Sequence, residues 1–204
     1  MHPVSKTMNR RHVLAGLAGI GLTTAMAPRA WAMTEAQASA LVSSAVGEIN
    51  AVIASGKPLG AMIGDFERIF SRYADVNIIA RSALGADANR LSAAQMRAFT
   101  GVFQGYMARK YGKRFEEFRG GRIEVKDVRP VKSWQEVQAT MYLRGQGPVS
   151  VIFLVSDRSG RDKFFDLVLE GVSLRISERS EIGALLDSKG GNVDAMIAEL
   201  RTRG

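Results

Sequence analysis

Hydrophobic and polar positions alternate most clearly between residues 149 and 176. The first part of this stretch reads VSVIFLVSD and the second reads DKFFDLVLEGVSLRI, with a turn around Gly160 between them. Alternation with a period of two, in β-branched and aromatic residues, predicts two antiparallel strands joined as a hairpin. Apolar residues lie on both faces of this hairpin. We therefore expect the rest of the chain to cover both faces or to leave a cavity against one of them.

The region before the hairpin has the three-to-four spacing of amphipathic helices. Helix starts are marked by two capping boxes, Thr34 with Gln37 and Ser92 with Gln95, and by Asp75 as a third N-cap. Four helices are predicted: from Thr34 to Gly56, from Leu59 to Tyr73, from Asp75 to Leu84, and from Ser92 to Gly120 with a kink at Gly112.

Two further strands precede the hairpin, and two short helices follow it. One strand begins at Ile123 and is broken by Pro130, and the next runs from Val137 to Leu143. The later helices are expected at 182–186 and, capped by Asn192, at 193–200. This order predicts an α+β fold in which a curved antiparallel four-stranded sheet packs against several helices.

The first 32 residues have the features of an export signal. Arg10 and Arg11 precede a mildly apolar run, and the small residues of Ala30-Trp31-Ala32 suit cleavage before Met33. The run is too short and too rich in glycine for a membrane span. We predict a cleaved signal peptide over 1–32, of the twin-arginine type or else of the general secretory type, and a single domain over 33–204 in the periplasm.

Composition restricts the chemistry of the predicted domain. The chain has no cysteine, and its two histidines, His2 and His12, both lie in the leader. The domain therefore lacks the commonest metal ligands, the commonest general base, and the Ser-His and Cys-His nucleophile systems. No phosphate-binding glycine motif is present. We expect no cofactor and no metal.

Charge does not point to nucleic acid. The chain carries 28 Lys and Arg and 20 Asp and Glu, and its formal net charge is +8. Four of the basic residues lie in the leader, which leaves 24 against 20, a net charge of +4 for the predicted domain. The basic residues are scattered and form no cluster interleaved with aromatics, so we expect no nucleic-acid partner.

Two features leave alternatives open. Asp166 and Glu170 are four residues apart on one predicted strand face, so a carboxylate-based hydrolase is conceivable, although a salt bridge or an edge position explains them more simply. The many large aromatic residues fit either a packed core or a pocket between helices and sheet. The pattern alone does not decide between a packed core and a pocket.

Several motifs carry a resemblance to a known family. The most specific strings are 74–85, with ADV, IAR and LG, and 165–174, FDLVLEGVSL, followed by Arg179. Phe66-x-x-x-Phe70, Phe99-x-x-x-Phe103 and Tyr111 add matching spacings. Over nearly all of 33–204 the chain resembles the MlaC family of periplasmic phospholipid carriers, also called the toluene-tolerance family. A hopanoid-associated branch of that family fits as well. At Glu178 and Ile182 the chain departs from the Tyr and Phe that are usual there.

The resemblance implies a soluble carrier that is not an enzyme. Such a carrier encloses the acyl chains of a phospholipid between sheet and helices, with the head group near the mouth of the cavity. Its implied partners are an inner-membrane lipid ABC transporter complex and an outer-membrane lipoprotein complex, between which a monomer would shuttle close to each membrane. The alternatives are a protein-binding adaptor with a fully packed core, and a carrier of another lipid such as a hopanoid.

We expect the lipid cavity to be lined by large apolar side chains from both the helices and the strands. The expected lining residues are Phe70, Tyr73, Ile79, Phe99, Phe103, Tyr106, Met107, Tyr111, Met141, Phe153, Val155, Phe165, Leu167, Val172 and Leu174.

Overall fold

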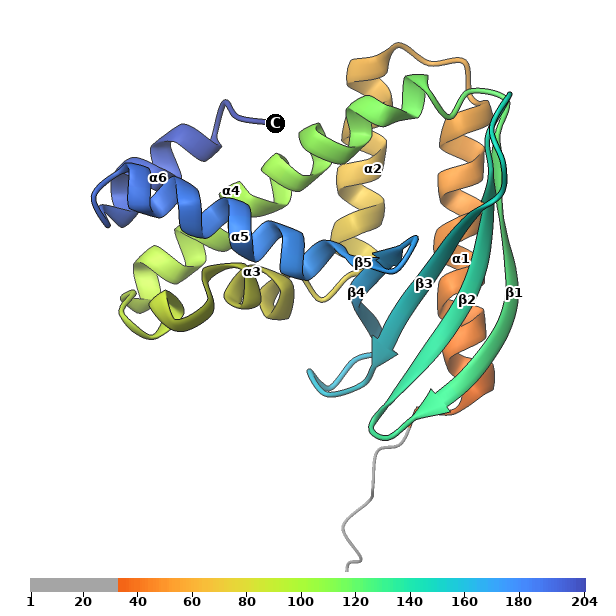
Figure 1. Ribbon diagram of the computed structural model, residues 1–204, viewed down its shortest axis with the longest axis horizontal. Helices are drawn as coiled ribbons and strands as arrows, with labels where there is room; N and C mark the ends of the chain where they lie inside the picture. Colours follow the sequence, from red (N-terminus) through yellow and green to blue (C-terminus); the bar gives the residue numbers. More distant parts are fainter. Residues whose placement is uncertain (1–32) are drawn as a thin grey trace, which may run out of the picture. The chain divides into compact units, whose positions relative to one another are not determined.

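The computed structural model describes residues 33–204, and the expected leader over 1–32 lies outside the described residues. Within this part the chain forms six α-helices, two short 3-10 helices and one antiparallel sheet of five strands, an α+β fold (Figure 1). In chain order the elements are α1 (Glu35–Ala54), α2 (Leu59–Tyr73), α3 (Val76–Leu84), η1 (Gly85–Asn89), α4 (Ala93–Gly112), η2 (Lys113–Glu116), β1 (Arg122–Val131), β2 (Trp134–Tyr142), β3 (Val149–Ser156), β4 (Lys163–Leu169), β5 (Val172–Ser173), α5 (Leu174–Ser188) and α6 (Val193–Leu200).

The predicted capping residues start the helices. The backbone N–H of Gln37 donates to Oγ1 of Thr34, while the Gln37 side chain accepts from the backbone N–H of Thr34. Ser92 and Gln95 form the same reciprocal pair at α4. Asp75 caps α3, as predicted. Each cap satisfies donors that the first turn of a helix leaves free, which fixes where the helix begins.

The sheet is a simple meander in the order β1-β2-β3-β4-β5. Pro130 does not break the first strand, which continues to Val131. This prediction was wrong because β1 is an edge strand, where a residue without a backbone N–H is tolerated. The fifth strand, β5, was not predicted. It follows a tight turn in which Glu170 and Gly171 have φ of 47° and 81°.

The helix after the sheet begins earlier than predicted. Residues 174–176 continue the apolar pattern of the hairpin, yet they form the first turn of α5. Ser173 decides this, because its Oγ accepts a hydrogen bond from the backbone N–H of Ile176. An N-cap serine thus ends the sheet and opens the helix within one residue.

A β-bulge interrupts the hairpin of β3 and β4. Leu154 pairs with Asp166, but Val155 pairs with Phe164, so Phe165 is an extra residue on β4. A bulge shifts the residues beyond it to opposite faces of the sheet. Phe164 therefore joins the face on which β3 is buried, in place of Phe165.

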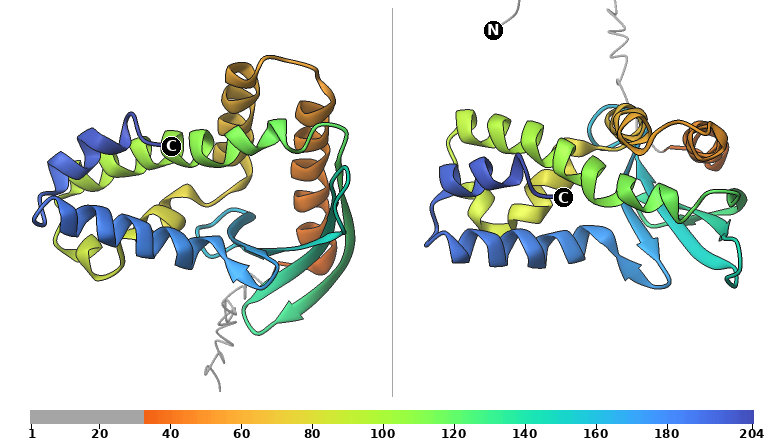
Figure 2. Two further views of the ribbon diagram at one scale, coloured as in Figure 1. Left: turned by 45° about the horizontal axis from the view of Figure 1, so that its top comes forward. Right: turned by 90° about the horizontal axis from the view of Figure 1, so that it is seen from above.

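The helices lie on one side of the sheet. Helix α1 packs along β1 and β2, and α2 lies between α1 and α4 (Figures 1 and 2). Helices α3, α4, α5 and α6 group at the end away from β1. This helical group has its own tightly packed interior. Its fully buried side chains include Phe99, Phe103, Ile182, Met196 and Leu200.

Candidate functional site

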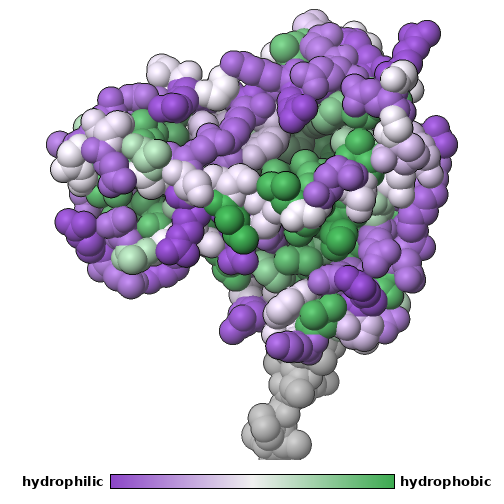
Figure 3. All heavy atoms as spheres, viewed as in Figure 1, coloured by the Kyte–Doolittle hydropathy of each residue, from purple (hydrophilic) through white to green (hydrophobic). Residues whose placement is uncertain are grey.

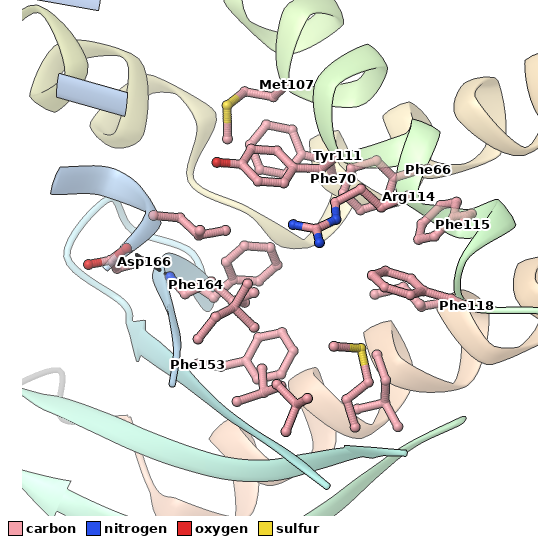
Figure 4. Close-up of a pocket in the computed structure, with 18 of the residues that line it drawn as sticks. Phe66, Phe70, Met107, Tyr111, Arg114, Phe115, Phe118, Phe153, Phe164 and Asp166 are labelled. Atoms are coloured by element: carbon pink, nitrogen blue, oxygen red, sulfur yellow. Dashed lines mark hydrogen bonds between the residues drawn. The ribbon is translucent and has the colours of Figure 1, made fainter. Parts of the chain in front are cut away.

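A pocket of about 310 Å³ lies between the buried face of the sheet and the helices (Figure 4). Its wall is almost entirely apolar and comes from every element except η1, β5 and α6. The sheet and its β2–β3 loop contribute Ile123, Met141, Leu143, Gln146, Val149, Val151, Phe153, Phe164, Asp166, Leu167 and Leu169, and the helices with the turn after η2 contribute Ile49, Phe66, Phe70, Ile79, Met107, Tyr111, Arg114, Phe115, Phe118, Leu174 and Arg175.

The strand register sets the sheet side of this wall. Val151 pairs with Leu169 and Phe153 with Leu167. Paired residues of antiparallel strands share a face, so these side chains form one apolar surface. The bulge adds Phe164, whose ring meets that of Phe153 edge to face at 5.7 Å. The bulge therefore gives the pocket an aromatic wall that regular alternation would have turned outward.

Aromatic residues also form the helix side. Phe66 and Phe70 are four residues apart on α2, so they lie on the same face. The ring of Phe115, in η2, meets that of Phe66 edge to face at 5.1 Å, and Phe118 follows at 6.0 Å from Phe115. These contacts give the helix side of the pocket an aromatic surface.

Asp166 is the one carboxylate in the wall, and it has structural partners. It is buried, with 3% of its surface exposed. Its Oδ1 accepts hydrogen bonds from the backbone N–H groups of Leu167 and Arg175, at 2.8 and 3.0 Å, and its Oδ2 accepts from the Ser173 hydroxyl at 2.6 Å. These bonds tie β4 to β5 and to the first turn of α5.

Asp166 and Glu170 do not form the carboxylate pair that the sequence allowed. Glu170 lies beyond the end of β4, in the turn with positive φ, and its carboxylate accepts from the backbone N–H of Ser150. The turn rotates Glu170 out of the strand alternation, so the two side chains have separate partners.

A buried polar network lies behind the pocket wall. Glu178 of α5 is completely buried, and its Oε1 accepts from the Tyr111 hydroxyl at 2.6 Å and from Nζ of Lys110 at 2.7 Å. Burial, followed by the hydrogen bond to Glu178, raises the pKa of Tyr111 well above its usual range. The hydroxyl thus stays a donor. Lys110 also pairs with Glu181, which accepts from the Tyr106 hydroxyl.

In 33–204 no group of three or more His, Cys, Asp or Glu side chains could hold a metal ion. None of the helices in that range is both long enough and apolar enough to cross a membrane.

Comparison with known proteins decides the family. The family model described as MlaC protein matches residues 43–202. The chain belongs to the MlaC family. Among solved structures, the fold is similar to that of a phospholipid-binding protein from Ralstonia solanacearum in complex with a phospholipid, with a TM-score of 0.67 and 19% sequence identity. The match covers 80% of this chain and 98% of the other. This structural likeness concerns the fold, which is the MlaC-like α+β arrangement described above.

The pocket of this MlaC-family protein includes eight of the residues expected from the sequence. They are Phe70, Ile79, Met107, Tyr111, Met141, Phe153, Leu167 and Leu174. Their role in binding stays a prediction. The structure shows only that they come together around one cavity.

Three expected residues of α4 lie outside the pocket. Phe99, Phe103 and Tyr106 have 0–2% of their surface exposed and pack on one another, with ring centroids 5.5 and 6.1 Å apart. The Tyr106 hydroxyl donates to Glu181 of α5, whereas Met107 and Tyr111 of the same helix line the pocket. These three side chains, Phe99, Phe103 and Tyr106, are therefore part of the packed interior of the helical group and do not line this pocket.

The other four expected residues also lie elsewhere. Val155 is buried in the core beside the pocket, and Val172 is 57% exposed in the short strand β5. The bulge turns Phe165 to the opposite sheet face, where it meets Trp134 edge to face at 6.2 Å. Tyr73 points to α1, and its hydroxyl donates to Glu48 at 2.7 Å.

Several lining residues were not among those expected. Phe66 could have been found, because it lies one helical turn before Phe70. Val149 and Val151 share the strand face of Phe153 and could have been found in the same way. Phe115, Phe118 and Arg114 could not, since their positions depend on how the chain leaves α4 in a 3-10 turn.

Proposed function

We propose that this protein is a periplasmic carrier that binds a phospholipid by its acyl chains and shuttles it between the outer and inner membranes. The apolar pocket is the observation that carries the proposal. In Figure 3 hydrophobic side chains gather in a hollow of the viewed face, beside the sheet. Membership of the MlaC family supports the proposal. So does the fold's likeness to a phospholipid-binding protein solved in complex with a phospholipid.

The energetics suit a carrier. Removing a methylene group from water is favourable by about 0.8 kcal/mol, so an apolar cavity is enough to hold acyl chains. A bilayer shelters the same methylene groups equally well, so exchange between pocket and membrane is close to neutral. The volume of about 310 Å³ is at the lower end of the range for small-molecule pockets.

We propose that the protein does not act on its ligand chemically. The carboxylate in the pocket wall, Asp166, already accepts three hydrogen bonds that hold β4, β5 and α5 together. A general base needs a free acceptor within reach of the substrate. Asp166 has its acceptor sites directed to the protein's own donors.

The pocket favours a lipid carrier over the alternative of a protein-binding adaptor with a fully packed core. We propose the partners that the family resemblance implies, an inner-membrane lipid ABC transporter complex and an outer-membrane lipoprotein complex. The net charge of +4 over 33–204 suits approach to anionic membranes. The apolar wall itself does not distinguish a phospholipid from a hopanoid.

The decisive experiment isolates the protein with whatever it has bound. The full chain is expressed in a Gram-negative host, the periplasmic form is purified, and its organic extract is analysed by mass spectrometry. The same protein is then tested for transfer of a fluorescent phospholipid from donor to acceptor vesicles. Co-purified intact phospholipid and transfer support the proposal. Absence of both contradicts it, a recovered hopanoid would point to the other lipid class, and accumulation of hydrolysed lipid would revive the hydrolase.

A further inference from the structure

Three charged residues contribute to the wall of the pocket: Arg114, Asp166 and Arg175. Two of them neutralise each other. Nε of Arg175 lies 3.5 Å from Oδ2 of Asp166, and its Nη1 donates to the hydroxyl of Ser82 at 3.2 Å. The Arg175 side chain is thus held by the protein, and its charge is balanced at close range.

Arg114 is held much less firmly. Its side-chain hydrogen bonds to other described residues go to Glu117 alone, from Nε and Nη2, and both are 3.4 Å long. That distance is beyond the ordinary range for an N–H···O bond. Both side chains are more than half exposed, 59% for Arg114 and 58% for Glu117, and exposed pairs of this kind contribute little.

The position of Arg114 at the pocket indicates its role better than its weak hydrogen bonds to Glu117 do. In Figure 4 its guanidinium extends into the cavity beside Tyr111 and Phe66. A side chain that both lines the pocket and is largely exposed lies where the pocket meets solvent. The pocket therefore offers an apolar interior with one weakly paired cation at its opening.

This arrangement fits an amphiphile with an anionic group close to its tail. The guanidinium fork matches two oxygens of a phosphate, and the apolar interior beside it suits the acyl chains. We infer that Arg114 binds the phosphate of a lipid head group while the acyl chains occupy the pocket. This inference rests on the proposed function and adds a determinant of head-group selectivity to it.

The test compares two ligands that differ only in the head group. Phosphatidylglycerol and diacylglycerol with identical short chains are titrated against delipidated protein, and a fatty acid serves as a carboxylate probe. The variants are Arg114→Gln and Arg114→Lys. The matched control is Arg97→Gln. It removes the same charge from an exposed position in the first turns of α4, outside the pocket. Thermal melting verifies that each variant is folded.

We expect Arg114→Gln to weaken phosphatidylglycerol binding about tenfold and to leave diacylglycerol binding unchanged. Arg114→Lys should retain part of the affinity, because it keeps the charge but loses the fork. Arg97→Gln should change neither ligand. The affinity of the unaltered protein for phosphatidylglycerol should also fall more steeply with salt than that of Arg114→Gln.

Equal losses for phosphatidylglycerol and diacylglycerol would overturn the inference, because Arg114 would then only shape the pocket. Unchanged binding of both would place the phosphate elsewhere. A loss confined to the fatty acid would assign the site to carboxylates. If the unaltered protein bound none of these ligands, the proposed function itself would fail, which is a separate outcome.

Discussion

The hydroxyl of Tyr111, a residue of the pocket wall, donates a hydrogen bond of 2.6 Å to the fully buried carboxylate of Glu178. Lys110 donates to the same oxygen, so one carboxylate of α5 binds two consecutive residues of α4. At Glu178 the sequence departs from the family pattern noted above. The pocket wall of this protein thus rests on an ionic contact between α4 and α5 at that position.

Replacing Glu178 by Ala should destabilise the fold by about 1 to 3 kcal/mol, because the buried Tyr111 hydroxyl loses its acceptor, whereas Lys110 keeps its pairing with Glu181. Urea unfolding measures the change. The matched control is Glu181→Ala, since Glu181 also binds Lys110 but its side chain is 51% exposed. That change should cost less than about 1 kcal/mol. Similar losses for the two variants would mean that burial of Glu178 adds nothing to its contribution.

Alkaline pH should weaken the fold through Tyr111. Burial, the hydrogen bond to Glu178 and the negative charge of Glu178 raise the pKa of Tyr111 far above the ordinary value of 10.0. The unfolded chain loses the phenolic proton near pH 10, whereas the folded chain keeps it. The stabilisation is therefore complete below pH 10 and declines as pH rises above it. Urea midpoints at about pH 9 and 11 should fall less in Tyr111→Phe than in the unaltered protein. Identical falls would contradict this assignment.

Local chemistry made the helix starts predictable. Thr34, Asp75, Ser92 and Asn192 each combine a capping side chain with a following apolar period, and all four are N-caps in the structure. The early start of α5 was missed because the alternation continues past Ser173. A capping serine inside an apolar run gives a weaker signal than the run itself.

The hydrophobic period of the sequence could not reveal the bulge or the pocket. Alternation assigns Phe165 to the face of Leu167, and only the pairing of Val155 with Phe164 reveals the extra residue. Periodicity likewise identifies the apolar face of α4, but it does not tell what lies opposite. Phe103 meets other helices and Met107 meets the cavity, although both belong to one stripe.

The fold explains why position 85, in one of the motif strings shared with the family, is a glycine. Gly85 has φ of 60°, and a Cβ built there would lie 2.9 Å from Nε of Arg179. The glycine and the arginine occur in separate motif strings, yet they lie against each other where α3 ends beside α5. The sequence shows both residues, but only the fold shows that the absent side chain of one makes room for the other.

Gly112 should tolerate alanine poorly. A Cβ at this position would lie 2.9 Å from Cγ1 and 3.3 Å from Cα of Ile63, so α2 and α4 would have to separate. We expect Gly112→Ala to lower the free energy of unfolding by about 1 to 3 kcal/mol, the usual cost of overpacking. Gly101→Ala is the control in the same helix, because its added Cβ meets nothing within 4 Å. That change should stabilise the fold by about 0.5 to 1 kcal/mol. The prediction fails if Gly112→Ala is neutral or stabilising in urea unfolding.

Asp substitutions should separate the packed core from the pocket. Phe103 is fully buried in the helical group, so Phe103→Asp would leave an unpaired carboxylate in a packed interior, at a cost of several kcal/mol. We expect this variant to lose its cooperative thermal transition. Phe153 lines the pocket, where water can reach a new carboxylate once the ligand has left. Phe153→Asp should therefore melt cooperatively at a lower temperature, while the phospholipid recovered in organic extracts falls at least tenfold. If Phe153→Asp unfolds as completely as Phe103→Asp, the cavity does not admit water and the pocket cannot be the place where a lipid is exchanged.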